Sequence, residues 1–191
     1  MNRREAIRNV ALLLGTAISA STLSALEGCN PKAPDNYALQ ASETKKILAE
    51  IAETIIPETS TPGAKAAEVD KFIVTMLNDC YKVEDQKIVL EGLKKIDEAS
   101  EKQFKKSFVD LSDEQKNTVL TAIDKERVDY NKRENKKEGD PTHYFQILKE
   151  LTLTGYFTSE PGATKALRYV AVPGKFEGCI PYKKGDKAWA V

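Results

Sequence analysis

Apolar residues recur at helical spacing through the middle of the chain, and the runs are separated by residues that start or stop helices. The first run predicts a helix from Ser42, a residue type that caps helix N-termini well, to Pro57, which cannot continue a helix. A second run follows a turn-forming stretch, residues 58–63. Its members fall at i, i+3, i+4, i+7, i+8 and i+11, and they are Val69, Phe72, Ile73, Met76, Leu77 and Cys80. This spacing puts all six on one stripe, so we predict that Cys80 lies at the end of a buried helix face.

Three further helices are predicted downstream. The third is more polar and carries Val89, Leu93 and Ile96 on its way to Phe104. Ser112 and Gln115 form a capping box that starts the fourth. Asp140 before Pro141 predicts the start of the fifth, whose apolar stripe is Tyr144, Ile147, Leu148 and Leu151. Residues 131–138 contain no apolar side chain, and we interpret them as a solvated helix end or loop between the fourth and fifth helices.

The composition changes after Ser159. A short helix extends at most to Leu167, and glycines and prolines then interrupt any regular element. Four aromatic residues are spread through this segment: Tyr169, Phe176, Tyr182 and Trp189. A segment of turns and rings cannot build a core of its own, so we expect it to lie across the helices or against a partner. The predicted fold class is all-α, with about five helices in a bundle-like domain and an irregular C-terminal strap.

The first 28 residues have the pattern of an export signal. Arg3 and Arg4 precede an apolar run from Val10 to Ala25, which is the arrangement of a bacterial twin-arginine signal peptide. The run contains glycine, serine and threonine and is weaker than the roughly 20 apolar residues of a spanning helix, although an uncleaved anchor stays an alternative. We therefore expect residues 1–28 to direct the protein to the periplasmic side of a bacterial membrane.

The signal ends in a sequence similar to a lipobox. In Leu26-Glu27-Gly28-Cys29 the thiol of Cys29 would receive a lipid, and the protein would then be anchored to the membrane. Glu27 departs from the small or apolar residue that is usual there, and the alternative is that Cys29 merely lies near an ordinary cleavage site. Residues 29–41 contain two prolines and are predicted to be a tether, which leaves residues 42–191 as the helical domain.

Two cysteines, Cys80 and Cys179, remain for the folded domain. Disulfides persist in an oxidising compartment, so a single bridge between them is the simplest pairing. It would close a loop of about 100 residues, worth on the order of 4 to 5 kcal/mol in the chain-entropy description. Sequence does not show whether the two Cα atoms come close enough, and two separate buried thiols stay an alternative.

Charge and motifs exclude several classes of function. The chain has 29 basic and 29 acidic side chains, so neither nucleic acid nor an anionic membrane surface is favoured as a partner by the overall balance. The only histidine, His143, has no metal-ligand cluster at a suitable spacing, and we expect it to be a surface or interface residue. The haem-attachment, dinucleotide-binding and nucleophile-elbow motifs are all missing. We predict no catalytic residue, no metal site and no cofactor bound by this chain.

Several stretches resemble the gluconate 2-dehydrogenase subunit 3 family, the small or gamma subunits of membrane-bound FAD-dependent sugar dehydrogenases. The resemblance begins with the twin-arginine leader and spans nearly the whole of the remaining chain. The segments that carry it are Ile51-Ala52-Glu53-Thr54-Ile55-Ile56-Pro57, Thr61-Pro62-Gly63-Ala64, Phe72-Ile73, Cys80-Tyr81, Leu151 to Glu160, Tyr169, Val172-Pro173-Gly174 and Gly178-Cys179. Their order and joint presence indicate the family, since no single segment is diagnostic.

The resemblance implies a non-catalytic accessory role. In such complexes a large flavoprotein of the glucose-methanol-choline oxidoreductase type binds FAD and oxidises a sugar or alcohol, and a haem c cytochrome passes the electrons onward. The small subunit carries the export signal for the flavoprotein, which has none of its own. This fits the leader, because FAD is loaded in the cytoplasm and the twin-arginine route moves folded cargo.

We expect the flavoprotein to dock on the end of the fifth helix and the aromatic tail, through Tyr156, Phe157, Tyr182 and Trp189, because interfaces are enriched in such rings. The alternative for any one of these rings is that it seals the tail onto its own helices. Two other functions stay open: a stand-alone helical lipoprotein that binds a ligand or scaffolds another complex, and an enzyme in its own right.

Overall fold

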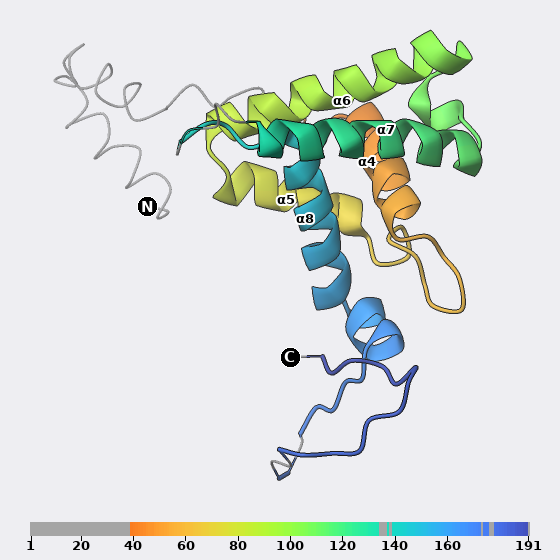
Figure 1. The fold of residues 1–191 in the computed structure, drawn as a ribbon, viewed down its shortest axis with the longest axis vertical. Coiled ribbons are helices and arrows are strands. Elements are labelled where there is room, and N and C mark those ends of the chain that lie inside the picture. Colours follow the sequence, from red (N-terminus) through yellow and green to blue (C-terminus); the bar gives the residue numbers. More distant parts are fainter. Residues whose placement is uncertain (1–38, 134–136, 138, 173, 176–177, 191) are drawn as a thin grey trace, which may run out of the picture. The chain divides into compact units, whose positions relative to one another are not determined.

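The computed structural model describes residues 39–133, 137, 139–172, 174–175 and 178–190. The described residues include five long helices (Figure 1): α4 (Ser42–Ile55), α5 (Val69–Cys80), α6 (Val83–Phe104), α7 (Asp113–Lys132) and α8 (Tyr144–Thr158). A 3-10 turn, η1 (Phe108–Asp110), precedes α7, and a π-helical turn, η2 (Gly162–Ala166), follows α8. No strand occurs among the described residues. The prediction of an all-α fold with about five helices is confirmed.

Helix α8 is the central element, because it contacts each of the other four long helices. Its buried residues form one wide face of the helix, about half of its circumference: Tyr144, Phe145, Ile147, Leu148, Leu151, Thr152, Gly155 and Tyr156. Helix α5 packs on α4 and α8, and α6 packs on α7 and α8. Most of the apolar core therefore forms around α8.

Two glycines allow neighbouring helices to approach each other closely. A Cβ added at Gly92 of α6 would lie 2.3 Å from ring carbons of Tyr144 on α8. A Cβ at Gly155 of α8 would lie 2.6 Å from Cδ1 of Phe72 on α5. Since real contacts of this kind are never so short, each glycine provides the space that an aromatic ring fills.

Helix boundaries agree with the sequence where a single local signal determines them. Helix α5 spans the predicted stripe, and the capping box at Ser112 is present with both of its hydrogen bonds. Helix α4 ends at Ile55, two residues before Pro57, as the preference of pre-proline residues for extended backbone requires. The predicted cap at Ser42 is wrong, because Ala41 occupies the N-cap position and no side chain caps this helix.

The predicted start of the fifth helix at Asp140-Pro141 is also wrong, since α8 begins at Tyr144. The side chain of Asp140 is bound elsewhere: its Oδ2 lies 2.5 Å from Nη2 of Arg133 and accepts a hydrogen bond from the Lys137 backbone at 3.0 Å. The carbonyl of Pro141 accepts from the Tyr130 hydroxyl at 2.8 Å. These residues thus fasten the connection to α7, and the helix starts three residues later.

The core extends beyond the predicted boundary of the domain. Leu39, which we assigned to the tether 29–41, is 1% exposed and belongs to the same apolar cluster as α4 and α5. Leu39 precedes the apolar repeat that begins at Ile47, so the sequence pattern does not reveal its burial. Packing therefore begins at least as early as Leu39.

The predicted disulfide is not formed. Cys80 and Cys179 are both free and exposed, so the alternative of two buried thiols is wrong as well. Cys80 is the last residue of α5, and the apolar stripe of this helix is no longer covered at that end. Cys179 lies in the irregular segment after η2. Periodicity placed Cys80 on the correct helix face but did not show where the covering elements end.

A pair of leucine variants on α8 tests the central role of this helix. Leu148 is fully buried and Leu153 is 41% exposed. Leu148→Ala should lower the free energy of unfolding by about 2 to 5 kcal/mol, because it leaves a cavity in the apolar core. Leu153→Ala makes the same change on the same helix and should alter it by no more than about 0.5 kcal/mol. Chemical denaturation of both variants measures the difference, and equal losses would contradict this packing.

Candidate functional site

The large apolar side chains that are exposed within the described residues all lie between positions 153 and 189. We call them the exposed apolar set: Leu153, Phe157, Tyr169, Val170, Val172, Ile180, Tyr182 and Trp189. Their exposed fractions run from 41% for Phe157 to 82% for Val172. The first two lie on α8 and the others in the strap, which we define as residues 167–190. A concentration of exposed apolar side chains in one part of a chain marks an interaction surface.

The strap leaves α8 through a tight turn. The Ser159 hydroxyl donates to the Tyr156 carbonyl at 2.6 Å and accepts from the Gly162 backbone at 3.1 Å. A Cβ at Gly162 would lie 1.8 Å from the Tyr156 carbonyl oxygen, so only glycine fits here. The chain then passes through η2 into the strap.

The two ends of the strap are hydrogen-bonded to each other. Arg168 donates its backbone N–H to Ala188 at 2.7 Å, and Ala190 donates to the Arg168 carbonyl at 2.9 Å. The Arg168 guanidinium lies 4.7 Å from the centroid of the Trp189 ring, and the Lys187 ammonium donates to the Lys165 carbonyl. Residues 168 to 190 therefore form a closed loop that is fastened to η2.

Of the four rings that we predicted to meet a partner, three are exposed and one is buried. Phe157, Tyr182 and Trp189 are exposed by 41%, 78% and 46%. Tyr156 is 2% exposed, so its assignment to the interface is wrong. It follows Thr152 at i+4 on the buried face of α8, and its hydroxyl donates to the Pro62 carbonyl at 2.6 Å. Phe157 follows Leu153 at i+4 on the exposed face and meets the Tyr156 ring edge to face.

The Pro62 carbonyl that binds Tyr156 belongs to an ordered loop between α4 and α5, for which the sequence predicted only a turn. The Glu53 carboxylate accepts hydrogen bonds from the backbones of Glu58 at 2.9 Å and Lys65 at 2.8 Å. Gly63 is buried against that carboxylate. Glu53 thus fixes both ends of the loop beside the end of α8. The sequence signal for this loop was Glu53, which lies in the Ile51–Pro57 segment that carries the family resemblance.

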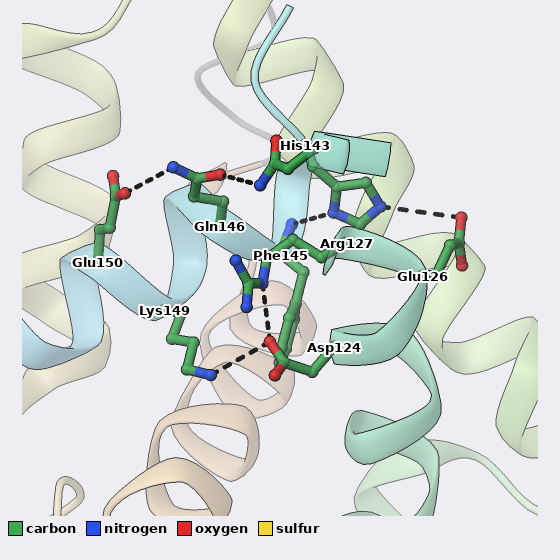
Figure 2. A network of polar contacts seen from close by, with 9 residues as sticks. Asp124, Glu126, Arg127, His143, Phe145, Gln146, Lys149 and Glu150 are labelled. Carbon is green, nitrogen blue, oxygen red and sulfur yellow. Dashed lines mark hydrogen bonds and ion pairs between the residues drawn. The ribbon is translucent and has the colours of Figure 1, made fainter. Parts of the chain in front are cut away.

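A second feature is the polar junction between α7 and the start of α8 (Figure 2). His143 is 6% exposed, so the expectation of a surface or interface residue is wrong. It is the N-cap of α8, and its Nδ1 accepts the Phe145 backbone N–H at 3.2 Å. The proton of the neutral ring is therefore on Nε2, which lies 3.8 Å from Oε1 of Glu126 on α7. The ring stacks on Tyr144 and meets Tyr130 edge to face.

The same junction holds charged groups that join α7 to α8. Asp124 binds Arg127 at 2.8 Å and Lys149 at 3.1 Å (Figure 2). The hydrogen bond from Arg127, followed by that from Lys149, lowers the pKa of Asp124, although burial opposes the shift. Gln146 accepts from Asn131 and donates to Glu150, both at 2.8 Å. Two of these contacts, Asp124 to Lys149 and Asn131 to Gln146, cross from α7 to α8 and hold the two helices together.

Among the described residues, no group of three or more His, Cys, Asp or Glu side chains is placed to hold a metal ion. In the same residues, every helix is too short or too polar to cross a lipid bilayer. The predicted export residues Arg3 and Arg4 and the predicted lipid site Cys29 lie outside the described residues.

Comparison with known proteins adds one finding. The family model for gluconate 2-dehydrogenase subunit 3 matches residues 42–174, a range that begins with α4 and ends inside the strap. No match was found among curated proteins or among solved structures.

The buried histidine predicts how stability depends on pH. Burial lowers the pKa of His143 more than the nearby Glu126 carboxylate raises it, and Lys95 and Arg127 lower it further. The unfolded chain then binds this proton more tightly, so the free energy of unfolding should fall as the pH drops from about 6.5 through the lowered pKa. Protonation also removes the acceptor that caps α8.

The test compares thermal unfolding at about pH 7.5 and about pH 5 for the unmodified chain and for His143→Asn. Asparagine keeps a side-chain acceptor at the N-cap and does not titrate. The variant should therefore lose less stability on acidification. Equal losses in the two proteins would show that His143 does not contribute to the pH dependence.

Proposed function

The chain belongs to the gluconate 2-dehydrogenase subunit 3 family, and we propose that it is the non-catalytic accessory subunit of an FAD-dependent dehydrogenase complex. The observation that carries this proposal is the match of the family model from α4 into the strap, residues 42–174. The large subunit in the proposal is a flavoprotein of the glucose-methanol-choline type, which binds FAD and oxidises a sugar or alcohol. A cytochrome with haem c is the proposed electron acceptor.

The exposed apolar set is the proposed docking surface for the flavoprotein. Phe157, Tyr182 and Trp189 offer large, rigid ring surfaces, and burial of such rings supplies much of the binding energy at protein interfaces. Phe157 projects from α8, which is held by four other helices, while the two strap rings lie on the closed loop. The surface thus combines a rigid part and an irregular part on one chain.

The accessory role includes export in this proposal. Arg3 and Arg4 form the twin-arginine pair, and the flavoprotein would travel folded and FAD-loaded with this chain to the periplasmic side of the membrane. Lipid on Cys29 would then hold the complex at the membrane. Each acyl chain of such a lipid contributes about 0.8 kcal/mol per buried methylene, and stable attachment without a spanning helix takes more than one chain or a second membrane contact.

Co-expression tests the subunit assignment. The flavoprotein produced with this chain should be soluble, FAD-loaded and co-purified as a yellow complex, and all sugar oxidation should belong to the large subunit. Tyr182→Ala should weaken the complex by about 2 kcal/mol if this ring is an anchor, and thermal unfolding of the isolated chain should stay unchanged because the ring is 78% exposed. The binding constant is measured by titration of the purified subunits.

Three outcomes would contradict the assignment. Sugar oxidation by this chain alone would make it an enzyme. A colourless monomer that retains a small ligand would favour a stand-alone lipoprotein. A flavoprotein that is exported and fully active in the absence of this chain would remove the accessory role.

Variants in the leader test export and anchoring separately. Replacing Arg3 and Arg4 with lysine should leave both subunits in the cytoplasm, since lysine lacks the planar guanidinium group that the receptor recognises. Cys29→Ala should leave export intact but release the complex from membranes. Fractionation followed by immunoblotting measures both, and export without the arginine pair would show that this interpretation of the leader is wrong.

A further inference from the structure

The strap differs from the helices in charge as well as in exposure. Its side chains include five basic and two acidic residues, while residues 39–166 include 20 basic and 24 acidic residues. The near-neutral total of the chain therefore conceals a positive strap attached to a negative helical domain. The basic side chains of the strap are Arg168, Lys175, Lys183, Lys184 and Lys187.

The positive charges lie among the exposed rings of the strap. Lys183 and Lys184 are exposed and directly follow Tyr182. The Arg168 guanidinium lies over the ring of Trp189, where it covers one face of an otherwise exposed indole. A partner that buries these rings must therefore also receive several positive charges.

We propose that the strap is a basic docking arm whose occupant is an acidic surface of the flavoprotein subunit, with apolar pockets for the rings and carboxylates around them. This inference rests on the proposed function and specifies the chemistry of the partner. Opposite charges on the two faces would speed encounter and select the correct orientation, since an acidic surface is attracted by the strap and repelled by the net negative helical domain.

Basic residues interleaved with rings are also typical of segments that lie on anionic membranes. The backbone of the strap favours a protein. Its described residues form no helix beyond η2 and no strand, and one isolated bridge pairs Arg168 with Trp189. An extended backbone that enters a bilayer loses its hydrogen bonds to water, whereas a protein surface can supply new partners for it.

The test uses charge reversal in the full chain bound to the FAD-loaded flavoprotein subunit. Lys183→Glu with Lys184→Glu should weaken the complex about tenfold at about 0.1 M NaCl. The control, Lys105→Glu with Lys106→Glu, reverses an exposed lysine pair at the end of α6 and should leave the binding constant unchanged. At about 1 M NaCl, where the Debye length falls to about 3 Å, the difference between the two variants should disappear.

The outcomes separate this inference from the proposed function. A complex that forms but responds equally to both reversals overturns the basic docking arm and leaves the accessory subunit standing. Absence of any complex with the unmodified chain overturns both. Sedimentation of the unmodified chain with phosphatidylserine-containing vesicles, lost on strap reversal while flavoprotein binding is kept, would assign the strap to the membrane instead.

Discussion

The burial of α8 by four other helices is the constraint on which the rest of the structure depends. The buried face of this helix covers about half of its circumference, and the helix contacts each of the other four long helices. Gly92 and Gly155 bring α6 and α5 close enough for this contact, because each leaves room for one aromatic ring. The same helix projects Phe157 outward and continues into the strap, so the packing of the core also determines where the proposed docking surface begins.

The polar contacts of α8 act at its two ends. At its start, His143 and the charged groups around Asp124 hold it to α7. At its end, the Tyr156 hydroxyl binds the loop after α4. A long helix fixed at both termini cannot slide along its neighbours, and this positions its exposed residues reproducibly. The buried His143 contributes to this attachment as the N-cap of α8.

Much of the fold could be predicted from the sequence, because helices α5 and α7 are determined by local signals: an apolar stripe in one, a capping box in the other. The predictions that are wrong concern residues whose position depends on contacts with distant parts of the chain. Asp140 binds Arg133 and so does not start a helix, and His143 is buried because α7 passes beside it. Tyr156 and Phe157 are adjacent and chemically alike, and only the periodicity from Leu148 through Thr152 distinguishes the buried ring from the exposed one. The distance between Cys80 and Cys179 depends on the path of the strap, which has no periodic pattern.

The double hydrogen bond of Glu53 has a consequence for how this chain can vary in evolution. One carboxylate holds both ends of the loop between α4 and α5, because it accepts hydrogen bonds from the backbones of Glu58 and Lys65. Pro62, whose carbonyl accepts the Tyr156 hydroxyl, lies between these two ends. Thr59 and Ser60 are exposed within the same interval. Relatives should therefore vary more at positions 59 and 60 than at Glu53, whose loss would release both ends of the loop at once.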